Sequence, residues 1–179
     1  MRNRKSEKGF TIIELVVVIL LLGILTATAL PRFMDITSEA HDAVVDGVLG
    51  GLNTAVALSR ATWFAQGRSG AITGMGNQTV NVNTLGYPTN QANGAPTSNT
   101  DCVTVYQQML QAGGRPTIST MAIAGVAPAA SDLEFDSDFQ ATHSASTCYF
   151  IYTAEGQNVS SPVLLYNTTA GTVLLGTEL

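Results

Sequence analysis

The sequence predicts an α+β protein, in which one long N-terminal helix packs through its second half on an antiparallel sheet. Two observations lead to this prediction. Residues 10–66 join a continuous apolar run to an amphipathic stretch with three-to-four spacing, which is the pattern of a helix. The C-terminal part instead carries short runs of β-branched and aromatic residues separated by turn residues, as strands do.

The first nine residues form a basic leader. Half of the eight basic residues in this chain of 179 residues lie there: Arg2, Arg4, Lys5 and Lys8. Beyond position 9, four basic and twelve acidic residues remain, a net charge of −8. A folded part with this charge lacks the basic face that nucleic acids require, so we expect no nucleic-acid partner. Residues 1–9 are expected to be a targeting segment that is removed by processing.

Residues 10–30 form an apolar run that is long enough to cross a membrane. A helix of this length rises roughly 30 Å, the thickness of one hydrocarbon core. Glu14 is the only ionisable side chain in the run, and its cost in a membrane indicates that it has a function. The basic leader predicts a cytoplasmic N-terminus and export of everything after Leu30. Two alternatives are an ordinary signal peptide cleaved near Ala27-Thr28-Ala29 and an uncleaved anchor.

The helix is expected to continue through residues 31–66 as an amphipathic segment. Apolar residues recur every three or four positions from Ile36 to Trp63, with charged residues mostly on the other face. Gly23 and Pro31 are expected to kink the helix, because glycine is a poor helix former and proline lacks an amide hydrogen. For an isolated chain we expect a mild kink in a continuous helix of roughly 85 Å.

Residues 67–179 are expected to form a globular head. Gly67 is expected to end the long helix in the left-handed conformation, and a loop-rich segment follows to about residue 100. A short helix is predicted from Asp101 to Ala112. Strands are predicted at residues 79–83, 132–139, 147–153, 162–167 and 172–175, the last two being joined by the turn Thr168-Thr169-Ala170-Gly171.

The acidic residues of segment 132–138 alternate with apolar ones, which predicts a half-buried strand with a solvated acidic face. Carboxylates are also the ligands that calcium prefers, so a calcium site in this segment is an alternative. The Asp-x-Asp-x-Asp-Gly loop pattern is absent, and we therefore predict no metal.

Cys102 and Cys148 are the only cysteines, and both lie in the part predicted to be exported. That compartment is oxidising, so a disulfide between them is expected, with two buried free thiols as the alternative. His41 and His143 are the only histidines, and no spacing places them near a nucleophile. No phosphate loop, dinucleotide fingerprint or nucleophile elbow occurs, so we predict no catalytic residue, no cofactor and no enzyme.

The stretch Gly9-Phe10-Thr11-Ile12-Ile13-Glu14, followed by the apolar run, resembles the prepilin signature of type IV pilins and type II secretion pseudopilins. The resemblance implies the type IV pilin fold and cleavage after Gly9 by a prepilin peptidase, which then methylates the new amine of Phe10. It also implies that Glu14 pairs with the Phe10 ammonium of an adjacent subunit during assembly, because a paired charge in an apolar bundle costs less than an isolated one.

A narrower resemblance covers Ala29-Leu30-Pro31-Arg32-Phe33-Met34-Asp35-Ile36, which looks like the mannose-sensitive haemagglutinin (MSHA) pilins. It implies a filament of identical subunits that serves surface attachment and biofilm formation. Before assembly, the chain would be anchored in the inner membrane with its head in the periplasm. The inner-membrane pilus assembly machinery would then move it into an extracellular filament. The alternatives are a pseudopilin of type II secretion and a membrane-anchored adhesion module that never polymerises.

Overall fold

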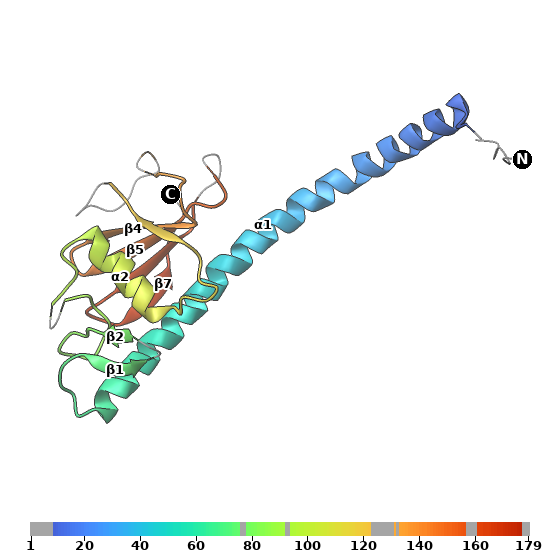
Figure 1. Ribbon diagram of the computed structural model, residues 1–179. Helices are drawn as coiled ribbons and strands as arrows, with labels where there is room; N and C mark the ends of the chain where they lie inside the picture. The colour runs from blue at the N-terminus through green and yellow to red at the C-terminus, as the bar shows by residue number, and fades with distance from the viewer. Residues whose placement is uncertain are drawn as a thin grey trace, which may run out of the picture. The chain divides into compact units, whose positions relative to one another are not determined.

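The computed structural model describes residues 9–75, 78–91, 94–122, 131, 133–156 and 161–176. The chain divides into two units, Met1–Asp42 and Ala43–Leu179, and helix α1 contributes to both. The predicted leader up to Lys8 lies outside the described residues. The elements are α1 (Ile12–Ala65), β1 (Ile72–Met75), β2 (Gln78–Val80), α2 (Asn99–Met109), β3 (Ile118–Thr120), β4 (Phe139–Ser144), β5 (Thr147–Tyr152), β6 (Val163–Asn167) and β7 (Thr172–Leu175) (Figure 1).

Helix α1 is continuous from Ile12 to Ala65, as the hydrophobic pattern predicts. Its helical backbone runs through both Gly23 and Pro31. Proline has no amide hydrogen to donate to the preceding turn, so one bond of the helical ladder is missing at Pro31. The backbone nevertheless stays helical there, so the expected continuity of the helix is confirmed, while the mild kink at Gly23 and Pro31 stays a prediction.

The C-terminal end of α1 is closed by glycine, at the residue that the sequence indicates. Gly67 has a φ of 83°. Its amide donates to the Phe64 carbonyl at 3.2 Å, and the Arg68 amide donates to the Trp63 carbonyl at 3.0 Å. These two bonds form a Schellman motif, which satisfies carbonyls that the helix end leaves without partners.

Helix α2 spans Asn99–Met109, close to the predicted short helix. Ser98 caps its N-terminus and accepts a hydrogen bond from the Asp101 amide, while the Asp101 carboxylate accepts one from the Ser98 amide. This reciprocal pair is a capping box. The helix ends before Gly113 and Gly114, at Leu110, whose extended backbone terminates it.

The main sheet has five strands in the order β3-β4-β5-β6-β7. Strands β4 to β7 pair antiparallel with their neighbours, whereas β3 pairs parallel with β4. The prediction of an antiparallel sheet is therefore correct for β4 to β7, but it does not include β3, which pairs in parallel at one edge. The predicted β6–β7 hairpin is present, and Gly171, with a φ of 65°, donates to the Asn167 carbonyl at 2.8 Å.

The predicted strand over residues 132–139 is wrong. Asp132 lies outside the described residues, residues 133–138 are not extended in a sheet, and β4 begins at Phe139. The physical reason is that Asp136 and Asp138 accept hydrogen bonds from side chains and backbone around β3, which holds the segment as a bend. The sequence patterns also give no signal for β1, β3 and β4.

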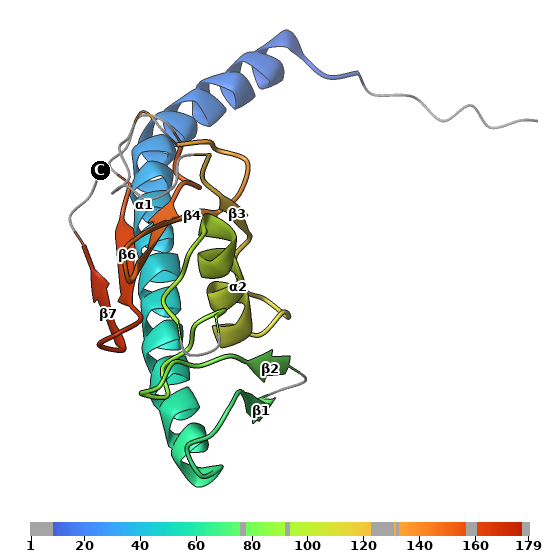
Figure 2. The same ribbon diagram turned by 90° about the vertical axis from the view of Figure 1, so that its left-hand side faces the viewer.

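The core of the head lies between α1, α2 and the sheet. The part of α1 after residue 42 buries one apolar stripe, formed by Val45, Val48, Leu52, Ala55 and Val56. Four aromatic side chains from α2, β4 and β5 meet this stripe: Tyr106, Phe139, Phe150 and Tyr152. In Figure 2, α2 and the β6–β7 hairpin are seen on either side of this part of the α1 ribbon. The amphipathic pattern from Val45 onward thus reflects burial in the head, whereas Ile36, which belongs to the same pattern, is 59% exposed.

Candidate assembly site

The N-terminal part of α1 exposes nearly every apolar side chain that it carries. Its large apolar residues from Phe10 to Leu30 are between 42% exposed, at Val16, and 91% exposed, at Phe10. In the described part of the chain, α1 is the one helix that is long and apolar enough to cross a membrane. Apolar surface of this extent indicates that a membrane or another protein covers it.

Two threonines in this apolar part have their hydroxyl groups satisfied by the helix itself. The Thr26 hydroxyl donates to the Leu22 carbonyl at 2.7 Å, and the Thr28 hydroxyl donates to the Leu25 carbonyl at 3.0 Å. Such bonds remove the cost of placing a free hydroxyl in an apolar environment. The two threonines therefore do not interrupt a surface that can be buried in lipid or between helices.

Glu14 is tied to Thr11 at the start of the helix. The Thr11 amide and the Thr11 hydroxyl both donate to Glu14 Oε2 at 2.9 Å, and the Glu14 amide donates back to Thr11 Oγ1 at 3.2 Å. This is a second capping box of the Thr-x-x-Glu type. This capping role of Glu14 is not among the predictions from the sequence, although the Thr-x-x-Glu spacing is its usual signal.

The second carboxylate oxygen of Glu14 is left for another donor. Both bonds from Thr11 end on Oε2, and Oε1 has no hydrogen-bond partner among the described residues. Gly9 and Phe10 lie directly before the cap, outside the helix and exposed. The structure therefore brings Gly9, Phe10 and Glu14 together within one short segment around the helix start.

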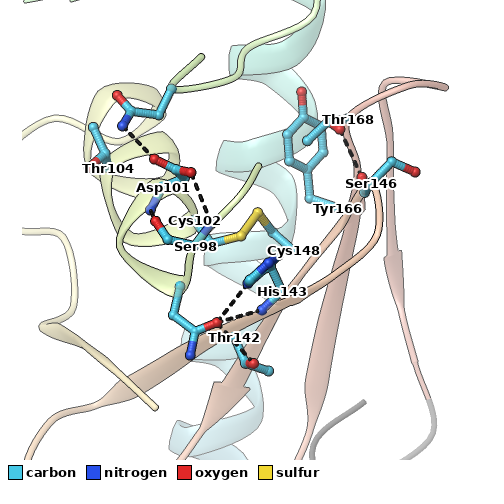
Figure 3. Close-up of a disulfide and its surroundings, with 12 residues drawn as sticks. Ser98, Asp101, Cys102, Thr104, Thr142, His143, Ser146, Cys148, Tyr166 and Thr168 are labelled. Carbon is cyan, nitrogen blue, oxygen red and sulfur yellow. Dashed lines mark hydrogen bonds between the residues drawn. A yellow bond between two sulfur atoms is a disulfide. The ribbon is translucent and has the colours of Figure 1, made fainter. Parts of the chain in front are cut away.

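The expected disulfide is present in the head. Cys102 on α2 and Cys148 on β5 are bonded, with their Cα atoms 5.5 Å apart and both side chains fully buried (Figure 3). The bond joins residues that are 46 positions apart, and it ties α2 to a central strand of the sheet. The two free thiols considered as an alternative are excluded in this structure.

Asp101, next to Cys102, organises the loop that precedes α2. Its side chain is 4% exposed. It accepts hydrogen bonds from Asn90 Nδ2 at 2.8 Å, from the Thr97 amide at 2.8 Å and from the Ser98 amide at 3.0 Å. Burial alone would raise the pKa of Asp101, but the hydrogen bonds from Asn90, Thr97 and Gln91 outweigh it and lower the pKa from 3.8 to about 2.

Asp101 should make the stability of the head depend on acid pH. A carboxyl whose pKa is lower in the folded state than in the unfolded chain stabilises the fold above the unfolded pKa. The Asp101 contribution, about 2 kcal/mol, should be complete above pH 4 and lost as the pH falls toward 2. The measurement is urea unfolding at pH 7 and pH 3 for the wild type and Asp101→Asn. The variant should be less stable at pH 7 and should show a smaller loss between the two pH values; an equal loss would contradict the assignment.

His143 belongs to a structural network rather than to a reactive site. Asn99 Oδ1 lies 2.9 Å from His143 Nδ1 and accepts hydrogen bonds from the His143 amide at 3.0 Å and from the Thr142 hydroxyl at 3.2 Å (Figure 3). Asn99 also donates to the Met121 carbonyl at 2.8 Å. This buried amide therefore connects the start of α2 to strand β4 and to the residue after β3.

The carboxylates Glu134, Asp136 and Asp138 do not form a metal cluster in the residues described. Across those residues, no group of three or more His, Cys, Asp or Glu side chains is placed to hold a metal ion. The Asp138 carboxylate instead accepts hydrogen bonds from the Thr117 amide and hydroxyl, both at 2.7 Å, and Asp136 accepts one from the Ser119 hydroxyl at 3.0 Å.

Comparison with known proteins bears directly on the N-terminal segment. Residues 4–30 match the model of the prokaryotic N-terminal methylation motif. The chain is 48% identical to the type IV narrow pilus major component of Thermus thermophilus over 29% of its own length and 45% of that protein. It is 31% identical to a fimbrial protein of Neisseria meningitidis over 67% of its own length and 58% of the relative. It is 47% identical to the type IV major alpha-pilin of Moraxella bovis over 28% of its own length and 32% of that pilin.

The chain thus spans from about a third to a little over half of the length of these curated relatives. No solved structure matches it in the corresponding search. The methylation-motif match, over residues 4–30, includes the cap at Thr11 and the apolar run that the structure leaves exposed.

Proposed function

We propose that this chain is a type IV pilin and thus a structural subunit of a pilus filament, as its N-terminal methylation motif and its pilin relatives support. Type IV pilins are structural proteins and not enzymes, in agreement with the prediction that the chain carries no catalytic residue. The proposal names identical subunits as the main partners of this chain.

The observation that carries the proposal is the exposed apolar part of α1. The apolar side chains from Phe10 to Leu30 are exposed to solvent in the isolated chain, so burying them in a membrane or against other helices is favourable. The inner membrane would cover this surface before assembly, and the helices of neighbouring subunits would cover it in the filament. Both environments are apolar, so the same surface serves each in turn.

We assign the processing sites to the segment before the helix. A prepilin peptidase would cleave between Gly9 and Phe10 and methylate the new amine. The free Oε1 of Glu14 supports pairing with the Phe10 ammonium of an adjacent subunit, since Thr11 occupies only Oε2. Glu14 would then both cap its own helix and set the axial position of its neighbour.

We further propose that the chain is a pilin of the MSHA type, because the stretch from Ala29 to Ile36 resembles those pilins. In this assignment the head faces the periplasm before assembly, and the inner-membrane machinery extrudes the subunit into a surface filament. That filament would serve attachment and biofilm formation. Deletion of the gene tests this part: loss of surface fibres and of attachment is expected, whereas lost enzyme secretion with intact fibres would assign the chain to the pseudopilins.

Intact-mass analysis of sheared surface fibres tests the subunit assignment directly. The mass should correspond to the chain from Phe10 onward, heavier by one methyl group and lighter by the two hydrogens lost in the disulfide. Unprocessed chain in the membrane with none in the fibres would contradict the proposal. A secreted head cleaved near Ala29 would instead indicate an ordinary signal peptide.

A further inference from the structure

The C-terminal end of α1 carries a cationic and aromatic surface that the pilin assignment does not use. Arg60 lies one helical turn before Phe64 on α1, and Arg68 follows the end of the helix at Ala65; Phe64 is 43% exposed. The Arg60 Cζ atom lies 5.6 Å from the centroid of the Phe64 ring, and the Arg68 Cζ atom lies 4.6 Å from it. We call Arg60, Phe64 and Arg68 the arginine patch. The Arg60 Cζ atom also lies 4.8 Å from the centroid of the Tyr87 ring, so Arg60 contacts two rings, and the two positive charges meet at Phe64.

The arginine patch is a local positive charge on an acidic protein. Only four basic residues follow the leader: Arg32, Arg60, Arg68 and Arg115. Arg115 is engaged with the carbonyls of Gln107 and Leu110. In the described part of the chain no ion pair to Arg60 or Arg68 is found. Because a guanidinium that contacts a ring through its face keeps its N–H donors at the edge, both groups can still bind carboxylates.

A complementary acidic surface lies elsewhere on the head. Glu134 and Asp136 are exposed and Asp138 is half-buried, and we call these three residues the acidic segment. Asp136 and Asp138 border an open cleft of about 400 Å³. Burial raises the pKa of Tyr152, and the charges of Asp138 and Glu155 raise it further, which places a fourth carboxylate in the same negative region.

The two surfaces lie at opposite ends of the head. In Figures 1 and 2 the end of α1 lies beside β1, whereas the segment before β4 lies at the far end of the main sheet. A single copy cannot bring these surfaces together without unfolding. Two different surfaces at opposite ends can join copies head to tail, and such a contact repeats along an open filament rather than closing into a dimer.

We propose that the arginine patch of one copy binds the acidic segment of a second copy. We choose a second copy as the partner because its acidic segment carries the negative charge that is complementary to Arg60 and Arg68. This inference rests on the proposed function, in which identical chains polymerise. Single exposed ion pairs are weak, but the contact recurs at every subunit, and like charges placed opposite one another are strongly unfavourable.

Charge reversal on each surface, alone and combined, tests the contact in the full chain expressed in its native host. Arg60→Glu with Arg68→Glu should lower the yield of sheared fibres about tenfold, since acids then face acids. Glu134→Lys with Asp136→Lys should do the same. The combination of all four changes restores opposite charges, and it should return the yield to within about threefold of the wild type if the residues couple directly.

The control adds two negative charges at exposed positions outside both surfaces, through Gln111→Glu and Thr169→Glu. This control should assemble like the wild type, and all variants should accumulate in the membrane with an intact disulfide. The inference is overturned if either reversal assembles normally, if the control loses as many fibres, or if the combined variant is no better than the weaker reversal. Absence of fibres from the wild type would instead refute the proposed function, so the two failures are distinguishable.

Discussion

Replacement of Glu14 by alanine should lower the yield of surface fibres about a hundredfold while the chain still inserts in the membrane. The carboxylate is the only charge in the apolar part of α1. If it pairs with the Phe10 ammonium of a neighbour, its removal leaves that ammonium buried without a counter-charge. Pilin in sheared fibres and in membranes, quantified side by side, measures the effect. Normal fibres on Glu14→Ala cells would contradict the role assigned to Glu14 in assembly.

Two further variants separate the charge of Glu14 from its function as a helix cap. Glu14→Gln keeps the capping geometry with Thr11 and loses the charge, so it should fail to assemble like the alanine variant. Thr11→Ala removes the cap, which costs about 1 kcal/mol of helix stability, and keeps the charge, so most fibres should remain. If Glu14→Gln kept its fibres and Thr11→Ala lost them, Glu14 would act through the helix start and not through a neighbouring subunit.

Removal of the disulfide should destabilise the head by about 4 kcal/mol, the largest stability effect expected for this chain. The bond closes a loop between residues 46 positions apart and links α2 to β5 across the core. Urea unfolding of the full chain in detergent measures the effect on Cys102→Ala with Cys148→Ala. Trp63 is a convenient fluorescent probe, because it is the only tryptophan and is 8% exposed in the folded head.

Reduction of the wild-type chain provides the matched control for that experiment. Dithiothreitol should shift the wild-type unfolding midpoint to that of the double variant and should leave the variant itself unchanged. A difference of less than about 1 kcal/mol between oxidised wild type and variant would mean that the cross-link hardly restricts the unfolded chain, contrary to the chain-entropy model.

The sequence predicts correctly those elements whose signals lie in neighbouring residues. The spacing of apolar residues predicts α1, the glycine at position 67 predicts its end, and turn residues predict the β6–β7 hairpin. The disulfide is also predictable, from the compartment rather than from any geometry. At the candidate assembly site, the roles of Gly9, Phe10 and Glu14 stay predictions from one motif, whereas the hydrogen bonds of Thr11 are seen only in the structure.

The failures have a common physical cause, which is pairing between distant residues. Strand β3 has only three residues and pairs in parallel with β4, so no hairpin turn beside it predicts the strand. Strand β4 contains Gln140 and Thr142, whose burial depends on partners such as Asn99 on another element. The acidic segment alternates like a strand, but its carboxylates are held by hydrogen bonds from residues around β3, which no local pattern reveals.

The helix start at Thr11 has a consequence for the cleavage that we propose between Gly9 and Phe10. Peptide bonds in a helix must be unwound before a protease can hold them extended, and every hydrogen bond broken adds to the barrier. The capping box ends the helical backbone at Ile12 and leaves the Gly9–Phe10 bond outside it and exposed. If a peptidase cuts this bond, as proposed, it does not have to unwind a helix first, and the capped first turn of α1 lies directly beside the bond.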